Sequence, residues 1–532
     1  MRHQNSLPIR HLFQTFFSTQ SVQPRSVVRS HNRVGLLNPN IKIYSTCIHN
    51  LRNFIGPQQH YIRSMVSSAY SSNVVVSSLS SPTAAVAGSP NIPTSAGKIH
   101  DEQNKKAMDD EYGDMNAVVG HTYVYPGPFR LESGIELPHA QLRYMTYGTL
   151  NSTRDNVVVV CHALTGNANV HTWWGNMIGP GQALDTQKYF IVCANILGSC
   201  YGSTGPSSSC PHYATTQQDS TTSDILPSTK YGMAFPDVSV QDTVRLQLHM
   251  LQDELKVQRI KCVIGGSFGG MQALEFAVQA GTAQSPFAFY CPRVKQKLPW
   301  VQSVIPMACG AAHTAWQIAI SEVQRQAIYA DPKWKDGNPS MDDPPISGLS
   351  VARQIGMISY RTPKAYEMKF GRRHRADEKI EESDIATQDK SGKVNGTYSY
   401  GSRAQWQVKS YLEYQGVKFL SRFDPITYIK LTEQMDSHDV GRNRGGKQMA
   451  LSHVRIPALV MGIDSDVLYP LWEQEELATL LPNSIFRVIR SDAGHDGFLL
   501  EQEQVSAHIT TFLNSLHSGN PDEMKSLPRS KL

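Results

Sequence analysis

The sequence predicts an α/β fold built on a mostly parallel β-sheet. From about residue 115 onward, short β-branched runs alternate with helical patterns, and these runs are apolar at nearly every position. Strands covered by helices on both faces have continuously apolar sequences, whereas a strand with one face in water alternates. The chain has 532 residues, 40% of them hydrophobic, so it can bury one large core.

Six strands and two helices follow from these patterns. The helices are expected at Val238–Leu255 and Met271–Gln279, and they separate the strands in the alternating order that is typical of parallel sheets. Residues 205–230 and 282–299 fit neither pattern and are predicted to be surface loops or insertions. In residues 282–299, prolines also argue against a helix. The predicted strands are Val157–Cys161, Tyr189–Ala194, Ile260–Ile264, Val301–Met307, Ala458–Gly462 and Ile485–Ile489.

Between residues 311 and 445 the alternation stops and helical patterns dominate, with helices expected at Ala312–Tyr329, Leu349–Tyr360 and Arg403–Leu420. This pattern predicts a helical cap inserted into the sheet domain, with residues 371–404 as a polar surface loop. The core is then formed by residues 115–310 and 446–518, and residues 519–532 are a C-terminal tail.

Residues 1–114 have the composition of a leader. The first 100 residues carry nine Lys and Arg and no Asp or Glu, so 41 basic and 45 acidic residues remain for the rest of the chain. An Arg-rich, Ser-rich, acid-free N-terminus is typical of an organelle transit peptide, and residues 66–97 read as a Ser/Pro/Ala/Val linker. The chain ends in Ser530-Lys531-Leu532, which is a peroxisomal address when free. We expect a mitochondrial location, with peroxisomal and cytoplasmic locations as alternatives.

Several protein classes are not indicated. The acidic body argues against a nucleic-acid partner, and no apolar run reaches the ~18 residues that a membrane span needs. Eight cysteines with no C-x-x-C spacing suggest neither a disulfide framework nor a structural metal site.

The most informative motif is Gly265-Gly266-Ser267-Phe268-Gly269, a G-x-S-x-G sequence. An apolar strand runs directly into Ser267, and a run of helix-forming residues follows it. This strand–turn–helix context is that of a nucleophile elbow. The alternative, a Gly-rich phosphate loop, lacks both the P-loop lysine and G-x-G-x-x-G spacing. We therefore predict Ser267 as a nucleophile on an α/β-hydrolase fold.

A serine hydroxyl needs a base, and on this fold the order is Ser…Asp…His. His495 lies in a glycine-flanked loop after the last predicted strand, which makes it the expected base. Asp464 and Asp466 both follow the preceding strand, and the pattern alone leaves either as the acid.

Two backbone N–H groups should form the oxyanion hole. One is expected from Phe268, and the other from Leu164, in the loop after Val157–Cys161. His162 stands at the start of this loop, and we interpret it as a residue that shapes the loop rather than as the base.

Taken together, these segments resemble the homoserine O-acetyltransferase family, the α/β-hydrolase acyltransferases of methionine biosynthesis, and especially the fungal form. The resemblance covers about residues 120–515. It is carried by CHALTGNANV, TWWGNMIGPGQALDT, ANILGSCYGSTGP, VIGGSFGGMQALEFA, EVQRQAIYADP, GLSVAR with SYRT, QVKSYLEYQGVKFLSRFDP, DSDVLYP and AGHDGFLLE. One departure is Phe268, which stands where the family usually has Met.

The resemblance implies ping-pong transfer of an acetyl group from acetyl-CoA to L-homoserine. It makes Ser267 the nucleophile, Asp466 the acid and His495 the base, and it implies no metal, no bound cofactor and a possible homodimer. It also implies that Arg353, Tyr360 and Asp496 bind the amino-acid substrate. Serine as acceptor, succinyl-CoA as donor, and a carboxylesterase or thioesterase remain alternatives.

Overall fold

The computed structural model describes residues 120–210, 230–373 and 406–518. The predicted transit peptide and linker, most of the predicted loops at 205–230 and 371–404, and the terminal Ser530-Lys531-Leu532 lie outside these ranges. Within them, no helix is long and apolar enough to cross a bilayer, and the seven cysteines are all unpaired.

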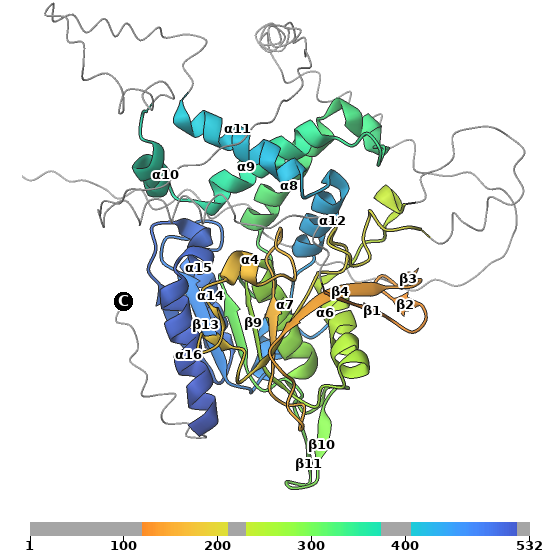
Figure 1. The fold of residues 1–532 in the computed structure, drawn as a ribbon, viewed down its shortest axis with the longest axis vertical. Helices are drawn as coiled ribbons and strands as arrows, with labels where there is room; N and C mark the ends of the chain where they lie inside the picture. The colour runs from red at the N-terminus through yellow and green to blue at the C-terminus, as the bar shows by residue number, and fades with distance from the viewer. Residues whose placement is uncertain (1–119, 211–229, 374–405, 519–532) are drawn as a thin grey trace, which may run out of the picture. The chain divides into compact units, whose positions relative to one another are not determined.

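The core is an eight-stranded sheet in which the six strands from β8 to β14 in spatial order are parallel. β1 and β4 extend it as antiparallel neighbours at one edge. The predicted α/β fold with a mostly parallel sheet is therefore confirmed (Figure 1). In spatial order the strands are β1 (His121–Val124), β4 (Gln141–Tyr147), β8 (Phe190–Ala194), β5 (Val157–Cys161), β9 (Ile260–Gly266), β12 (Val304–Met307), β13 (Ala458–Ile463) and β14 (Ser484–Ile489).

Helices cover both faces of the sheet, which explains why the central strands are apolar throughout. All five residues of β5 are buried. Val157, Val159 and Cys161 belong to one hydrophobic cluster, whereas Val158 and Val160 belong to the other. The first cluster includes residues of α6 (Val240–His249), α7 (Phe268–Ala280) and α14 (Leu471–Leu480), and the second includes residues of α4 (His171–Trp174) and α16 (Gln502–Ser518).

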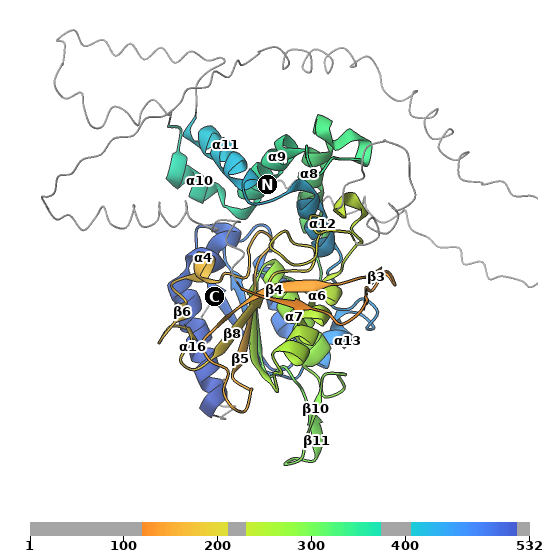
Figure 2. The ribbon, with the colours of Figure 1, turned by 45° about the vertical axis from the view of Figure 1, so that its right-hand side comes forward.

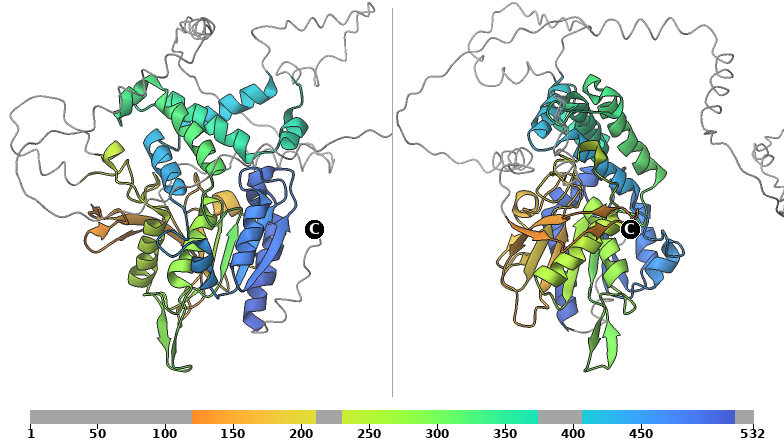
Figure 3. Two further views of the ribbon diagram at one scale, coloured as in Figure 1. Left: turned by 180° about the vertical axis from the view of Figure 1, so that it is seen from behind. Right: turned by 90° about the vertical axis from the view of Figure 1, so that its right-hand side faces the viewer.

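Between β12 and β13, the chain forms a set of helices that lies over one end of the sheet (Figures 1 and 3). Pro residues at the starts of α10 and α12 and a Thr362 cap on α10 mark helix beginnings. The helices are α8 (Ala315–Tyr329), α9 (Ile346–Tyr360), α10 (Pro363–Phe370), α11 (Gln407–Leu420) and α12 (Pro425–Asp436), followed by α13 (Lys447–Ser452).

The main differences from the sequence prediction lie at element ends and at short strands. The predicted strand Val301–Met307 is shorter, because only residues 304–307 pair continuously. The prediction missed β1 and β4, which belong to the sheet's antiparallel edge. Residues 282–299 are not a plain loop: β10 (Phe289–Cys291) and β11 (Gln296–Leu298) form a hairpin at the end opposite the cap (Figure 2).

Candidate active site

Ser267 occupies a sharp turn between β9 and α7. Its backbone has φ 58° and ψ −125°, a conformation that non-glycine residues rarely adopt. The flanking glycines have a steric reason. A Cβ atom on Gly265 would lie 2.2 Å from the Gly269 carbonyl oxygen, and one on Gly269 would lie 2.1 Å from the Cys161 carbonyl oxygen. The small residues therefore allow the strained turn that presents the serine.

The structure brings Ser267, His495 and Asp466 together in one hydrogen-bonded row. His495 Nε2 lies 2.8 Å from Ser267 Oγ, and His495 Nδ1 lies 2.7 Å from Asp466 Oδ2. All three side chains are buried. This arrangement fixes the imidazole with one nitrogen toward the hydroxyl and the other toward a carboxylate, as general-base activation of a serine requires.

The environment of His495 stabilises its protonated form. Burial alone lowers the pKa of the imidazole. The negative charge and hydrogen bond of Asp466, with a further contribution from the charge of Asp496, outweigh this effect and raise the pKa above its ordinary value. The residue is thus suited to accept and hold a proton during reaction.

The geometry separates the two aspartates that follow β13. Asp466 Oδ1 accepts hydrogen bonds from the backbone N–H groups of Leu468 (2.8 Å) and Tyr469 (2.9 Å), which leaves Oδ2 for His495. Asp464 instead accepts from the Ser491 backbone and pairs with Arg490. Asp464 therefore stabilises a turn beside the site and does not contact the imidazole.

The predicted oxyanion donors flank the hydroxyl. Phe268 is the first residue of α7, so its N–H lies at the positive end of the helix. Leu164 lies in the loop after β5 and lines the same cavity as Ser267. Among the residues that the structure describes, no group accepts a hydrogen bond from either amide, and both are available to a bound oxyanion.

His162 is fully buried at the start of this loop. Its Nδ1 lies 2.8 Å from the Ala163 carbonyl oxygen, and its Nε2 lies 3.2 Å from the Ile196 backbone nitrogen. Burial lowers the pKa of His162 to about 4. It is therefore a neutral residue that shapes the loop.

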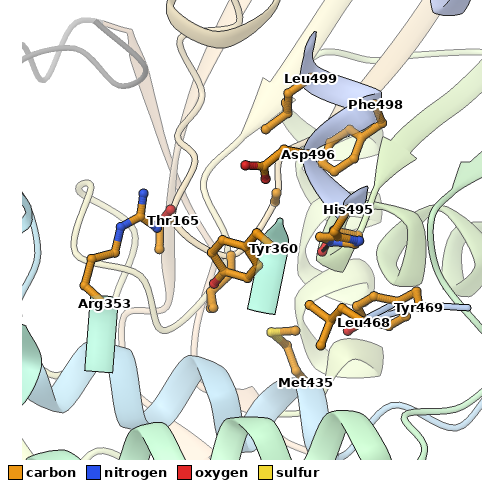
Figure 4. A pocket seen from close by; sticks show the side chains of 13 residues that line it. Thr165, Arg353, Tyr360, Met435, Leu468, Tyr469, His495, Asp496, Phe498 and Leu499 are labelled. Carbon is orange, nitrogen blue, oxygen red and sulfur yellow. Dashed lines mark hydrogen bonds between the residues drawn. The ribbon is translucent and has the colours of Figure 1, made fainter. Parts of the chain in front are cut away.

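Thirteen residues line the cavity above Ser267, and they come from both the core and the cap (Figure 4). Arg353 and Tyr360 lie two turns apart on α9 and both line it. The Tyr360 ring contacts the Arg353 guanidinium at 5.9 Å and the His495 ring at 6.1 Å between centroids. A cation is thus buried in the same cavity as the serine.

Asp496 also lines this cavity, but it has a partner that the sequence did not indicate. Its Oδ2 lies 2.8 Å from Arg361 Nε, and both side chains are largely buried. If Asp496 binds the substrate amine as predicted, it does so while one of its carboxylate oxygens is paired with Arg361. Groups of three or more His, Cys, Asp or Glu placed to hold a metal are absent from the described part of the chain.

The alpha/beta hydrolase fold family matches residues 156–502. The homoserine O-acetyltransferase of Salinibacter ruber is 42% identical over 384 residues, which are 72% of this chain and 94% of the relative. The chain belongs to the homoserine O-acetyltransferase family. The homoserine O-acetyltransferase of Trichormus variabilis is 40% identical over 76% of this chain and 97% of its own length. The solved homoserine O-acetyltransferase of Bacillus anthracis shares the fold, with a TM-score of 0.59, 22% identity, and coverage of 74% of this chain and 97% of its own.

In this homoserine O-acetyltransferase family member, the structure adds site residues that the sequence did not single out. Tyr469 stacks on the His495 ring with centroids 4.9 Å apart, and its hydroxyl lies 3.0 Å from His313 Nε2. The sequence feature that could have indicated Tyr469 as a site residue is its position three residues after Asp466. Met435, from the end of α12, also lines the cavity. Only the packing of cap on core places it there.

Proposed function

We propose that this protein transfers an acetyl group from acetyl-CoA to the γ-hydroxyl of L-homoserine through an acyl-serine intermediate. The observation that carries the proposal is the hydrogen-bonded row of Ser267, His495 and Asp466 in a cavity that also contains Arg353 and Asp496. The relatives named above are homoserine O-acetyltransferases, which supports an acetyl group as the group transferred and homoserine as its acceptor.

In the first half-reaction, Ser267 Oγ attacks the thioester carbonyl of acetyl-CoA while His495 Nε2 takes the hydroxyl proton. The Leu164 and Phe268 amides donate to the oxyanion, and one such donor contributes on the order of 3 kcal/mol. The tetrahedral adduct then expels the CoA thiolate, which takes the proton from His495. The product is an acetyl ester on Ser267.

In the second half-reaction, homoserine replaces CoA. Arg353 binds the α-carboxylate, for which a guanidinium provides two parallel N–H donors. Asp496 lines the same cavity and binds the α-ammonium while its Oδ2 stays paired with Arg361. His495 takes the γ-hydroxyl proton, the alkoxide attacks the acetyl ester, and collapse returns the proton to Ser267 Oγ.

The cap has a chemical purpose in this scheme, since water would hydrolyse the acetyl ester. Helices α9 and α12 contribute Tyr360 and Met435 to the lining of the cavity, and the side chains of Ser267, His495 and Asp466 are buried beneath it. Exclusion of water from such an intermediate favours transfer over hydrolysis.

The decisive test is a matrix of homoserine and serine against acetyl-CoA and succinyl-CoA, with release of free thiol as the readout. We expect homoserine with acetyl-CoA to give the highest kcat/KM. A single methylene discriminates by only about 1–3 kcal/mol, so some activity with serine is compatible with the proposal. Thiol release that does not depend on either amino acid would identify a thioesterase instead.

We further propose that residues 1–114 direct the protein to mitochondria. The support is compositional, namely nine basic and no acidic residues in the first 100 positions. Residues 1–114 fused to a fluorescent protein should enter mitochondria. A full-length protein that stays in peroxisomes until Leu532 is removed would assign the address to Ser530-Lys531-Leu532 instead.

A further inference from the structure

Arg422 is a buried cation on the cap to which the proposed chemistry gives no role. It lies between α11 and α12, and only 8% of the residue is exposed. Its Nη1 donates to the carbonyl oxygen of Thr165 (2.9 Å) and to the Tyr201 hydroxyl (3.2 Å), and its guanidinium packs 4.8 Å over the Phe419 ring. A buried guanidinium requires such partners, because an unpaired charge in the interior is costly.

The Thr165 carbonyl belongs to the loop that carries the Leu164 amide. Other carbonyls of this loop are held from the core side. These contacts are His162 O with Gln272 Nε2 (3.3 Å), Ala163 O with His162 Nδ1 (2.8 Å), and Asn167 O with Trp173 Nε1 (3.1 Å). Thr165 is therefore the point at which the cap, rather than the core, fixes the conformation of the loop.

We infer that Arg422 is a positioning residue for the oxyanion hole: by holding the Thr165 carbonyl from the cap, it orients the Leu164 amide of the same loop toward the oxygen that becomes negative when Ser267 attacks. This inference rests on the proposed acyl-serine function. Oxyanion donors act because they are fixed in place before charge develops, and displacement of a reacting group by about 1 Å can cost about 10²-fold in rate.

This role has a consequence for the order of events. Because Arg422 comes from the cap and Thr165 from the core, the hole is complete only when these two parts are packed together. Attack on an acyl group is then favoured when cap and core are packed against each other. The arrangement links transition-state stabilisation to protection of the acetyl ester.

The alternative role for this side chain is to bind the acceptor carboxylate. The Arg353 and Arg422 guanidinium groups pack 5.1 Å and 4.8 Å from the same Phe419 ring, so Arg422 could add positive charge for the acceptor carboxylate. The two roles make different predictions. A carboxylate-binding role affects only the step with homoserine, whereas a positioning role affects attack on any acyl donor.

The test compares Arg422→Met and Arg422→Lys with the wild type in the acylation half-reaction. Stopped-flow bursts are measured with acetyl-CoA and with p-nitrophenyl acetate, which has neither a carboxylate nor a CoA moiety. We expect Arg422→Met to lower the first-order acylation constant by about 10- to 10²-fold with both donors, with KM for homoserine little changed. Arg422→Lys keeps the charge without the planar fork and should show a smaller loss.

Arg444→Met is the matched control. Arg444 pairs with Glu275 on α7 and does not line the cavity, so its loss tests the general effect of removing a partly buried arginine. Its acylation constants should match the wild type. If Arg422→Met does not fold, Arg422→Lys carries the same comparison.

Three outcomes would count against the account. Wild-type acylation constants in both Arg422 variants would overturn the inference. Unchanged bursts with a raised KM for homoserine would also overturn it and assign Arg422 to the acceptor carboxylate. A wild-type protein that never acylates Ser267 would instead refute the proposed function, and that result is visible without any Arg422 variant.

Discussion

Replacement of Asp466 by Asn tests how the catalytic row works. The change keeps the shape of the side chain but removes the charge that lies 2.7 Å from His495 Nδ1. Opposite charges about 4 Å apart attract by about 4 kcal/mol at an effective dielectric of ~20, and an amide can also hold the imidazole in the wrong tautomer. Together these effects predict a loss of about 10⁴-fold in kcat, which corresponds to roughly 5.4 kcal/mol.

The pH dependence gives this prediction a sign. His495 must be neutral to take the serine proton, so the rate of the wild type falls as the pH drops through a His495 pKa that lies above its ordinary value. Without Asp466, the effect of burial is no longer outweighed and the pKa falls. The acidic limb of the profile should therefore move to lower pH in Asp466→Asn.

The assay is the burst of p-nitrophenolate from p-nitrophenyl acetate, measured in single-turnover mode from pH 5 to 9. Asp464→Asn is the matched control, because Asp464 lies two residues away but pairs with Arg490 and the Ser491 backbone. It should keep the wild-type rate and profile. Near-normal acylation by Asp466→Asn, or an acidic limb that moves to higher pH, would refute this reasoning.

Three further predictions concern other parts of the molecule. Arg353→Lys should raise KM for homoserine about 10-fold or more, because the bidentate fork is lost; steady-state kinetics would contradict this if KM for homoserine were unchanged. Gly269→Ala should cost more than about 3 kcal/mol of stability, because its Cβ would lie 2.1 Å from the Cys161 carbonyl oxygen; urea unfolding that matches the wild type would exclude this. Burial, with contributions from the Asp466 and Glu476 charges, raises the pKa of Glu473 to about 7, against the opposing hydrogen bond from Gln317. The stability that this neutral carboxyl contributes is fully present below pH ~4.5, and up to roughly 3 kcal/mol of it is lost as the pH rises through about 7. Glu473→Gln should therefore be more stable than the wild type at pH 8. Denaturation curves with equal midpoints at that pH would contradict this prediction.

The sequence indicates the parts of this molecule that local chemistry determines. The Gly265–Gly269 turn is readable because only small residues avoid the backbone contacts that the turn creates. The central strands are readable because burial on both faces leaves no polar position. The order of Ser267, Asp466 and His495 follows from the connectivity of the fold.

Other features depend on packing between distant segments, and no local pattern reports them. The ion pair of Asp496 with Arg361 joins positions more than a hundred residues apart, and the Arg422 contact with Thr165 joins cap to core. Each residue taken alone is compatible with a solvated surface position. The hairpin of β10 and β11 was missed because its strands have three residues each, too few to show an alternating pattern.

The most direct measurement is intact-protein and peptide mass spectrometry after mixing the protein with acetyl-CoA alone. We expect a mass increase of one acetyl group on the peptide that contains Ser267, its removal on addition of homoserine with formation of O-acetylhomoserine, and no adduct in Ser267→Ala. A protein that converts both substrates to products while Ser267 is never acetylated would contradict it.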